Sequence, residues 1–281
     1  MLFWATVSFT AVTWVINPQL LEDMDLQRLL DVDQLLVRFQ SGEVAQQPAA
    51  IPAPPPSDGY VQTAFDECRD FFPRGKPPIV PAGLAMRELC FTSFAILHSG
   101  DTKTPVFVAQ RLNSQMLKAA VKVKRNDNFY EEARLPQAER ATLADYRGSG
   151  FDRGHMAPAG DMHNDETMAQ SFSLANMVPQ NAQHNRGAWN KIEQDVRKYV
   201  KRAKGDVYVV TGPVYKSQPK TIGQNEVAIP TYLYKAVYDA TTGRAFVHWH
   251  QNSEHAEADA PISYETFVDR SNMHWLSAAE Q

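Results

Sequence analysis

The order of apolar and polar residues separates an N-terminal segment from the rest of the chain. Residues 2–16 are uncharged and almost wholly apolar. In residues 18–40, apolar side chains then recur every three or four positions, at Leu29, Val32, Leu36 and Phe39. This spacing predicts one amphipathic helix. The stripe is too short to define a coiled coil, so the helix either packs on the protein itself or contributes to a homodimer.

A proline-rich stretch, QQPAAIPAPPPSDG, follows this predicted helix. Its composition favours extended polyproline geometry and a semi-rigid spacer. We therefore predict three parts: residues 1–17 as a signal peptide or membrane anchor, residues 18–58 as the amphipathic helix and linker, and residues 59–281 as the folded domain.

Strand and helix patterns alternate after the linker. Four apolar stretches read as strands or a hairpin, at residues 91–99, 104–112, 206–214 and 232–251. Residues 187–204 instead repeat their apolar positions with a helical period, at Ile192, Val196, Tyr199 and Val200. The predicted fold class is α+β, with a mixed, mostly antiparallel sheet.

Charge is distributed unevenly. The formal net charge of the 281 residues is −4, but residues 1–58 alone carry −5, so the remainder carries +1. Residues 185–204 hold seven basic and two acidic side chains, a local balance of +5. A basic stretch of this kind attracts a polyanion in spite of the acidic total.

The two cysteines and the apolar N-terminal segment bear on the compartment. Cys68 and Cys90 are 22 positions apart, too few for a thiolate zinc site, and they form either one disulfide or two buried thiols. Residues 2–16 are shorter than a membrane-spanning helix and close to the core of a signal peptide. We expect an exported protein, periplasmic, membrane-anchored or secreted, with a buried N-terminal helix as the alternative.

The stretch GFDRGHMAPAGDMH holds the first group of candidate site residues. In an extended segment Arg153 and His155 share one face, whereas Asp152 points the other way. A neutral histidine can take a proton from water, and an arginine can hold phosphate oxygens through charge-assisted hydrogen bonds. The pair suits cleavage of a phosphodiester.

The predicted helix, with Asn185 at or just before its N-terminus, supplies a second group. This group steps by four residues through Asn185, Trp189, Glu193 and Arg197. Amide and carboxylate oxygens are ligands that Mg²⁺ accepts, and Mg²⁺ keeps several of its own waters. Each feature also has a simpler explanation: a surface histidine, an asparagine helix cap, an i,i+4 ion pair and a solvated basic face. Their occurrence together in this order favours a functional site over these separate explanations.

The motifs Asp152-Arg153-Gly154-His155, Asn176 in LANMVPQ, and Asn185-Arg186-Gly187-Ala188-Trp189 with Glu193 beyond resemble those of the non-specific DNA/RNA endonucleases of the ββα-metal superfamily. The resemblance implies a ββα-metal active-site motif, DNA and RNA as substrates, and Mg²⁺ as cofactor, with Mn²⁺ as a substitute. It implies that His155 is the general base, that Asn185 binds the metal directly and that Glu193 orients metal-bound water.

The remaining roles implied by the resemblance concern charge and support. Arg153 would lie beside the scissile phosphate, and Arg197 and Arg125 would stabilise the transition state. Asn176 would hold site residues in place without itself contacting the substrate or the metal. We assign Asp152 to local structure rather than to chemistry.

Two other functions fit parts of the same sequence. One is a membrane-tethered nucleic-acid-binding protein with a decayed nuclease site, and the other is a sequence-specific homing or restriction nuclease. No zinc finger or separate recognition module is visible to support the latter. His248 and His250 face the same way on a predicted strand, where core or interface packing is favoured over metal binding. The choice between DNA and RNA, the biological role and any inhibitor protein stay open.

Overall fold

A computed structural model describes residues 51–52, 59–83 and 85–276 of the chain. The predicted apolar segment and amphipathic helix lie outside these residues, so both stay predictions. The chain divides into two units by its internal contacts, at Gln47 and Pro48. Within the second unit, Ile51–Pro52 of the proline-rich stretch forms a short strand, β1.

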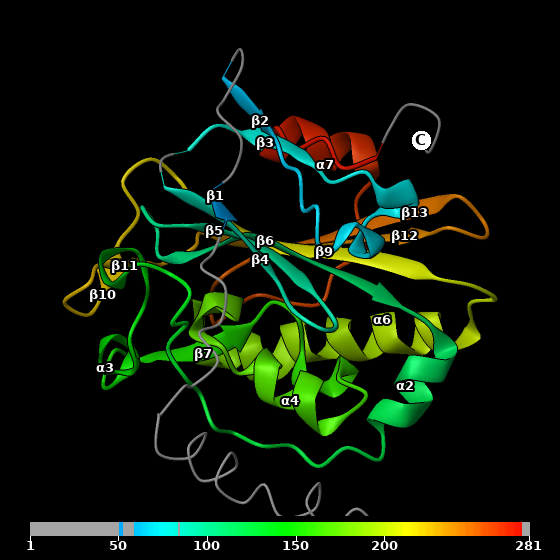
Figure 1. The fold of residues 1–281 in the computed structure, drawn as a ribbon, viewed down its shortest axis with the longest axis horizontal. Coiled ribbons are helices and arrows are strands. Elements are labelled where there is room, and N and C mark those ends of the chain that lie inside the picture. The colour runs from blue at the N-terminus through cyan, green and yellow to red at the C-terminus, as the bar shows by residue number, and fades with distance from the viewer. Residues whose placement is uncertain (1–50, 53–58, 84, 277–281) are drawn as a thin grey trace, which may run out of the picture. The chain divides into compact units, whose positions relative to one another are not determined.

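An antiparallel sheet of seven strands, in the order β1-β4-β5-β6-β9-β12-β13, forms the centre of the described residues. Figure 1 shows its strands crossing the middle of the domain. The long strands are β6 (Thr104–Leu112), β9 (Val207–Val214), β12 (Tyr232–Asp239) and β13 (Arg244–Gln251). Beyond β6 lie β5 (Ala95–Ser99), β4 (Met86–Cys90) and, at the edge, β1. The predicted α+β class is confirmed.

Most predicted strands match the structure closely, with one exception. β6 and β9 occupy the predicted stretches, and the predicted hairpin is β12 paired with β13. Residues 91–94, predicted as part of a strand, instead form the turn between β4 and β5, in which the Phe91 N–H donates to the Phe94 carbonyl at 2.9 Å. Apolar side chains in this turn serve the core rather than a strand.

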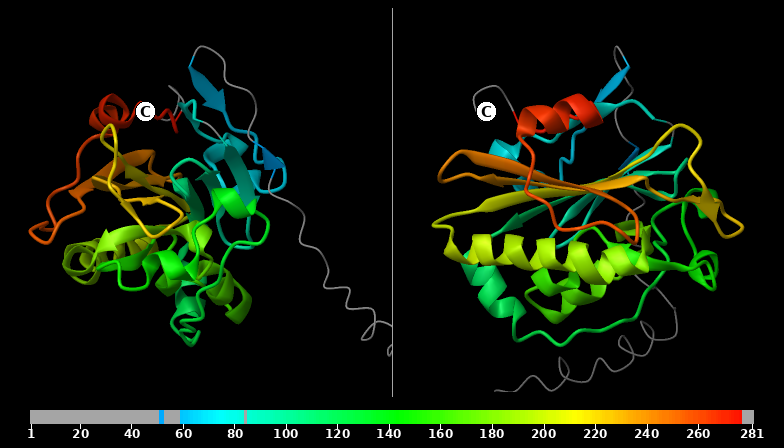
Figure 2. Two further views of the ribbon diagram at one scale, coloured as in Figure 1. Left: turned by 90° about the vertical axis from the view of Figure 1, so that its left-hand side faces the viewer. Right: turned by 180° about the vertical axis from the view of Figure 1, so that it is seen from behind.

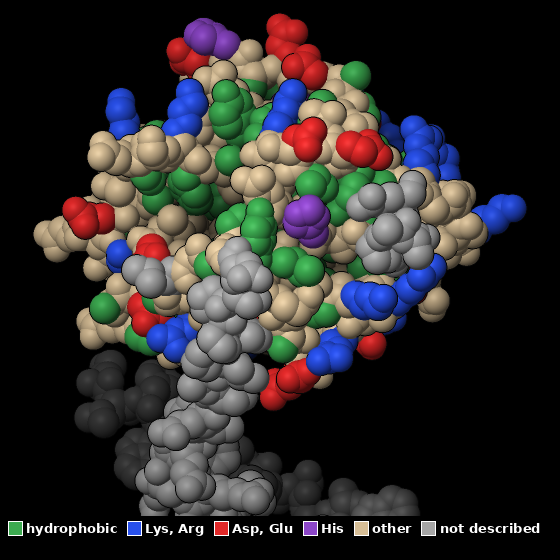
Figure 3. Space-filling model, turned by 90° about the horizontal axis from the view of Figure 1, so that it is seen from above, with side chains coloured by type: hydrophobic (Ala, Val, Ile, Leu, Met, Phe, Trp, Pro, Cys, Tyr) green, Lys and Arg blue, Asp and Glu red, His purple; other side chains and the backbone are tan. Residues whose placement is uncertain are grey.

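Alternation along the strands gives the sheet two apolar faces. In β12, Leu233 and Val237 belong to one buried cluster, whereas Tyr234 and Ala236 belong to the other, as a period of two requires. Figure 2 shows α6 (Asn190–Arg202) on one side of the sheet and α7 (Tyr264–Ser271) on the opposite side. Acidic and basic side chains both appear on the α7 side (Figure 3).

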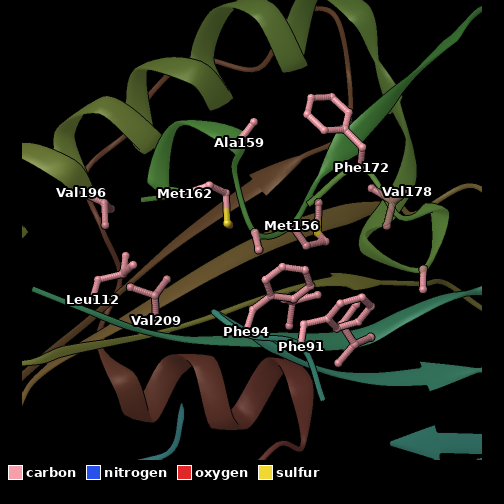
Figure 4. Close-up of a cluster of buried hydrophobic side chains, with 14 of the residues drawn as sticks. Phe91, Phe94, Leu112, Met156, Ala159, Met162, Phe172, Val178, Val196 and Val209 are labelled. Atoms are coloured by element: carbon pink, nitrogen blue, oxygen red, sulfur yellow. The ribbon is translucent and has the colours of Figure 1, made fainter. Parts of the chain in front are cut away.

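The cluster on the α6 side also includes the residues that follow β7 (Phe151–His155). Figure 4 shows Met156 and Met162 in the same buried cluster as Phe94 and Val209. Both methionines are fully buried. The segment that follows His155 is therefore fixed against the sheet by apolar packing.

Three short elements complete this side of the domain. They are α2 (Ser114–Ala120), α3 (Leu143–Tyr146) and α4 (Asp165–Ser171). On the opposite side, β2 (Tyr60–Gln62) pairs with β3 (Ile79–Pro81). A further pair, β10 (Thr221–Ile222) with β11 (Val227–Ala228), projects from the end of the sheet near α3 (Figure 1).

The two cysteines form a disulfide, Cys68–Cys90, with Cα atoms 5.8 Å apart. It joins the segment after β2 to the end of β4. The sequence left disulfide and free thiols as alternatives, and the structure selects the disulfide. Among the described residues, no helix is long and apolar enough to cross a membrane.

Candidate active site

A two-stranded antiparallel ribbon and the helix that follows it carry the candidate residues. The ribbon pairs β7 with β8 (Met177–Asn181), and His155 lies opposite Met177 in the register. The chain passes from β8 directly into α5 (Ala182–His184), then through a π-helical turn, Asn185–Trp189, into α6. This succession of two strands and a helix is the predicted ββα motif.

The ribbon confirms the predicted extended conformation of the DRGH stretch. Arg153 and His155 share one face and both line a cavity of about 370 Å³. Gly154 lies between them with no room for a side chain, because a Cβ there would collide with the Gln180 Oε1 atom and approach the Gln180 Cβ to 2.6 Å. Gln180 is itself fully buried, so glycine is required where the two strands meet.

The helix begins earlier than the sequence predicts. Its N-cap is Asn181, whose side chain accepts hydrogen bonds from the backbone N–H groups of Gln183 and His184 at 3.0 and 3.1 Å. Asn185 is therefore not a helix cap but a residue inside the helix. The sequence predicted the helix from Gly187 onward, from the spacing of its apolar residues, and the structure extends it to Ala182.

The π-helical turn also changes which residues face the cavity. In a regular α-helix, eight steps of 100° would place Asn185 and Glu193 about 80° apart around the axis, and a wider turn absorbs the extra residue. Asn185, Asn190, Glu193 and Arg197 line the cavity, whereas Trp189 is fully buried in the core. The predicted stripe of four-residue steps is therefore wrong at Trp189, whose place is taken by Asn190.

Six of the seven candidate residues line this one cavity, which we call the catalytic cavity: His155, Arg153, Asn185, Glu193, Arg197 and Arg125. Asn176 does not. It is fully buried, and its side chain accepts from the Ala157 N–H and donates to the Ala157 and Ser171 carbonyls, all at 2.9 Å. Asn176 thus ties the backbone just beyond His155 to α4.

His155 is enclosed by aromatic rings. The ring centroids of Phe129 and Phe172 lie 5.8 and 5.0 Å from that of His155. Nε2 is buried without a hydrogen-bond partner among the described residues, which leaves Nδ1 as the accessible ring nitrogen. Burial, together with the positive charge of Arg125, lowers the pKa of His155 to about 3. The imidazole is therefore neutral at physiological pH.

Asn185 is held in a fixed orientation by Asp152. Its Nδ2 donates to Asp152 Oδ2 at 2.9 Å, and Arg186 donates to both oxygens of the same carboxylate at 2.9 and 2.7 Å. Although burial opposes ionisation, these bonds hold the pKa of Asp152 below its usual range. We expected Asp152 to serve local structure only, but it contacts a site residue because Asn185 reaches across the ribbon.

Glu193 and Arg197 lie one helical turn apart on α6. Burial raises the pKa of Glu193 to about 7, against the opposing charges of Lys235 and Arg197. Arg197 donates from Nη1 to Asp161 Oδ1 at 3.1 Å, and Asp161 is 5% exposed. The buried carboxylate fixes the arginine at the wall of the catalytic cavity.

Sequence reasoning missed Lys235, Asp161 and Asn190. Lys235 is 2% exposed on β12, and its Nζ donates to Thr211 Oγ1 at 2.7 Å and to the Met156 carbonyl at 3.4 Å. A lysine inside the apolar run YLYKAVY was a visible signal, because lysine is almost never buried unless it has partners. Asp161 and Asn190 gave no such signal.

The histidines of β13 pack against neighbouring rings. His250 is buried, and its ring stacks on His184 with centroids 5.9 Å apart. In the described part of the chain, no group of three or more histidine, cysteine, aspartate or glutamate side chains could hold a metal ion. A cation at the catalytic cavity would therefore depend on Asn185, on Glu193 and on its own waters.

The Asn185 side chain fits such a cation. Its Nδ2 is committed to Asp152, so the amide oxygen is turned away from that carboxylate, and it accepts no hydrogen bond from any described residue. An amide oxygen and a carboxylate in a cavity open to water can hold a hydrated divalent ion of the magnesium type.

A ββα motif that places histidine, asparagine and arginine around one basic cavity is typical of metal-dependent nucleases, a class of phosphodiester hydrolases. The sequence model described as DNA/RNA non-specific endonuclease matches residues 78–272. The chain belongs to this family.

Individual relatives agree with the family. The chain is 38% identical over 158 residues to the mitochondrial nuclease EXOG of Danio rerio, covering 52% of this chain and 46% of that protein. It is 33% identical over 188 residues to the mitochondrial endonuclease G of Homo sapiens, covering 63% of this chain and 62% of that protein. The chain spans about half the length of the mitochondrial EXOG nucleases to which it is similar.

A solved structure agrees as well. The fold matches a chain from a crystal structure of the EndoG/EndoGI complex, which concerns the mechanism of EndoG inhibition, with a TM-score of 0.58 and 26% sequence identity. The match covers 66% of this chain and 84% of that chain.

Proposed function

We propose that the protein is a metal-dependent, largely sequence-non-specific endonuclease that hydrolyses phosphodiester bonds in DNA and RNA. One observation supports this most directly: His155 and Asn185, thirty residues apart in the sequence, line the same cavity together with Arg153, Glu193 and Arg197. The group combines a base, an oxygen ligand and two permanent positive charges.

His155 acts as the general base in this proposal. Its neutral ring offers Nδ1 to a water molecule in the catalytic cavity, and the flanking rings of Phe129 and Phe172 hold the imidazole plane in place. Transfer of the water proton to His155 generates the nucleophile that attacks phosphorus. A positioned base typically contributes a factor of about 10²–10⁴ in rate.

Asn185 and Glu193 hold the metal in this proposal, Asn185 directly and Glu193 through a water molecule. Mg²⁺ suits these oxygen ligands, and Mn²⁺ is the expected substitute. When bound, the ion would supply Lewis-acid stabilisation of the charge on the leaving 3′-oxygen.

The arginines bind and neutralise the phosphate. Arg153 lies on β7 two residues before the base, and Arg197 is directed at the cavity by its ion pair with Asp161. Arg125 is exposed and lies over the Phe172 ring, 5.2 Å from its centroid, so it approaches the same phosphate from a separate loop. Fixed positive charge at a transferring phosphoryl group is a strong source of transition-state stabilisation.

Plasmid nicking with and without a chelator tests the proposal. The purified protein is expected to nick supercoiled plasmid in Mg²⁺ and to stop in EDTA, and His155→Ala is expected to abolish nicking while it keeps oligonucleotide binding. His255→Ala, at an exposed histidine outside the catalytic cavity, is the matched control.

Nicking by His155→Ala at the parental rate would contradict the assignment of the base, and nicking in EDTA would contradict the metal. Binding without any nicking would favour the alternative of a membrane-tethered nucleic-acid-binding protein with a decayed site.

We also propose that the protein is exported, to the periplasm, to a membrane or out of the cell. The Cys68–Cys90 disulfide supports this, because disulfides persist in oxidising compartments. Fractionation of cells that express the full chain, followed by detection of the protein, tests the localisation. Recovery in the cytosolic fraction alone would exclude it.

A further inference from the structure

A further pocket, of about 450 Å³, lies at the end of α6 that is farther from the β7–β8 ribbon. It opens between the chain that joins α6 to β9 and the turn that joins β12 to β13. Figure 2 shows these two connections at the same end of the sheet. The pocket shares no described lining residue with the catalytic cavity. We call it the distal pocket, and it is a separate pocket on the same helix.

Close contacts fix the walls of the distal pocket. A Cβ at Gly205, in the chain between α6 and β9, would collide with the Thr241 Oγ1 atom of the β12–β13 turn. Asp239 is 3% exposed and accepts hydrogen bonds from the Tyr199 hydroxyl and from the Thr241 N–H, both at 2.9 Å. The turn is therefore held against α6, and the pocket is a fixed part of the fold.

The walls of the distal pocket carry an excess of positive charge. Arg202, Lys204 and Arg244 line it and are exposed. None of the three forms an ion pair within the described part of the chain. Asp239 is the single carboxylate among the described lining residues, and both of its oxygens accept hydrogen bonds. Three positive charges thus stand against one negative charge, and arginine and lysine side chains bind phosphate oxygens.

The geometry of α6 relates the distal pocket to the catalytic cavity. From Glu193, nine steps of about 100° and about 1.5 Å place Arg202 about 180° around the axis and about 14 Å along it. Lys201 and Lys198 fall between them, at about 80° and 140°, and both are exposed. Lys198 also pairs with Asp195, whereas Lys201 has no ion-pair partner among the described residues. Positive charge therefore predominates across the exposed face of α6, from one pocket to the other.

We propose that the distal pocket binds a backbone phosphate of the same nucleic acid whose scissile phosphate lies in the catalytic cavity. Arg202 and Arg244 hold this phosphate, and the bound strand crosses the exposed face of α6. A nucleic acid is favoured over a separate anion, such as a lipid headgroup, because the basic face leads from the pocket to the catalytic cavity. The inference rests on the proposed nuclease function and deepens it: a long substrate is bound at two places, and a short one at the catalytic cavity alone.

The salt dependence of binding tests the distal pocket without hydrolysis. In EDTA, fluorescence anisotropy measures the affinity for a DNA duplex that is long enough to cover both pockets, at several salt concentrations. Each phosphate contact contributes about 0.9 to the slope of log affinity against log salt concentration. Arg202→Ala combined with Arg244→Ala is therefore expected to weaken binding and to make this slope shallower by about 1. An unchanged slope would overturn the site.

Two control variants separate a phosphate contact in the distal pocket from a general effect of charge. Arg202→Lys combined with Arg244→Lys keeps both charges and is expected to keep the slope. Arg270→Ala removes an exposed arginine of α7, on the opposite side of the sheet, and is also expected to keep the slope. A loss of slope in Arg270→Ala equal to that in the double alanine variant would overturn the site. All substituted side chains are exposed, so each variant is expected to fold, which urea unfolding checks.

Kinetics with two substrates supply a second readout. The double alanine variant is expected to raise the KM for the long duplex severalfold and to keep its kcat. Its hydrolysis of bis(p-nitrophenyl) phosphate, which is too small to reach the distal pocket, should stay at the parental rate. Duplex hydrolysis with the parental KM and slope would overturn the site and leave the nuclease function intact. A shallower slope in a protein that hydrolyses neither substrate would support the site and remove the nuclease function.

Vesicles that contain phosphatidylserine test the lipid headgroup as the ligand. The double alanine variant is expected to sediment with these vesicles to the same extent as the unsubstituted protein. A loss of vesicle binding in this variant, together with an unchanged slope for the duplex, would assign the distal pocket to a lipid headgroup and overturn the proposal.

Discussion

Asn185 donates a hydrogen bond from Nδ2 to Asp152 Oδ2 at 2.9 Å, across the junction between the ribbon and the helix. This contact fixes the orientation of the Asn185 side-chain amide, and therefore the direction in which the amide oxygen points. It also joins the two sequence motifs, because Asp152 belongs to the DRGH stretch and Asn185 opens the NRGAW stretch. The two motifs are thus parts of one hydrogen-bonded unit.

Asp152→Ala is expected to slow nicking about 10- to 100-fold, the range typical for loss of a group that orients a metal ligand. The physical reason is that the Asn185 amide loses its fixed orientation, so the Mg²⁺ concentration that gives half-maximal rate should rise. Asp195→Ala, which removes a carboxylate of α6 paired with Lys191 and Lys198, is the control. An unchanged Mg²⁺ requirement in Asp152→Ala would argue against the positioning role.

Asn185→Ala removes the amide oxygen itself. We expect a larger rise in the Mg²⁺ requirement than for Asp152→Ala, by a further factor of about ten, with partial recovery of the rate at high Mg²⁺. The measurement is a titration of the nicking rate against Mg²⁺ for both variants. A variant with a reduced rate but the parental Mg²⁺ midpoint would show that Asn185 acts in some other way.

Gly154→Ala is expected to destabilise the domain by about 1–3 kcal/mol, the usual cost of overpacking, because its Cβ would clash with Gln180. The matched control is Gly187→Ala. A Cβ at Gly187 would meet no heavy atom within 4 Å beyond its chain neighbours and the backbone of its own helix, and alanine favours a helix by up to about 1 kcal/mol. Urea unfolding measures both, and equal stability of the two variants would refute the close approach.

His98 is expected to make stability depend on pH. It is fully buried, donates from Nε2 to the Glu139 carbonyl at 2.8 Å, and has its pKa lowered by burial to about 4. Since the unfolded chain binds the proton more readily, stability is complete above about pH 6.5 and falls as the pH drops toward 4. The slope from this group is about 1.4 kcal/mol per pH unit.

Urea unfolding between about pH 7 and pH 4.5 measures this slope. His98→Gln should have a shallower slope than the unsubstituted protein, whereas His255→Gln, at an exposed histidine, should match it. A slope in His98→Gln as steep as in the unsubstituted protein would assign the effect to other groups, such as His184 and His248, whose pKa values burial also lowers to about 4.

The sequence predicted the regular elements well, because strands and helices leave a period in the order of apolar residues. It predicted β6, β9 and the β12–β13 hairpin, and it placed Arg153 and His155 on one face of a strand. Six candidate site residues, named from motif order and resemblance, do meet at one cavity. Local patterns were sufficient for these conclusions.

Features that depend on packing between distant segments could not be predicted in this way. The contact of Asp152 with Asn185, the ion pair of Asp161 with Arg197 and the burial of Lys235 each join residues from different elements. The π-helical turn also left no periodic signal, so steps of four residues placed Trp189 in one stripe with Asn185 and Glu193, although it belongs to the core.

The π-helical turn at residues 185–189 holds one residue more than a regular helix needs to keep Asn185 and Glu193 on one side. If that residue were removed and a regular helix restored, seven steps of 100° would leave the two residues about 20° apart around the axis. A single-codon deletion inside the turn would therefore preserve the phase between the two halves of the site. The turn should tolerate the loss of one residue better than the regular turns of α6 that follow it.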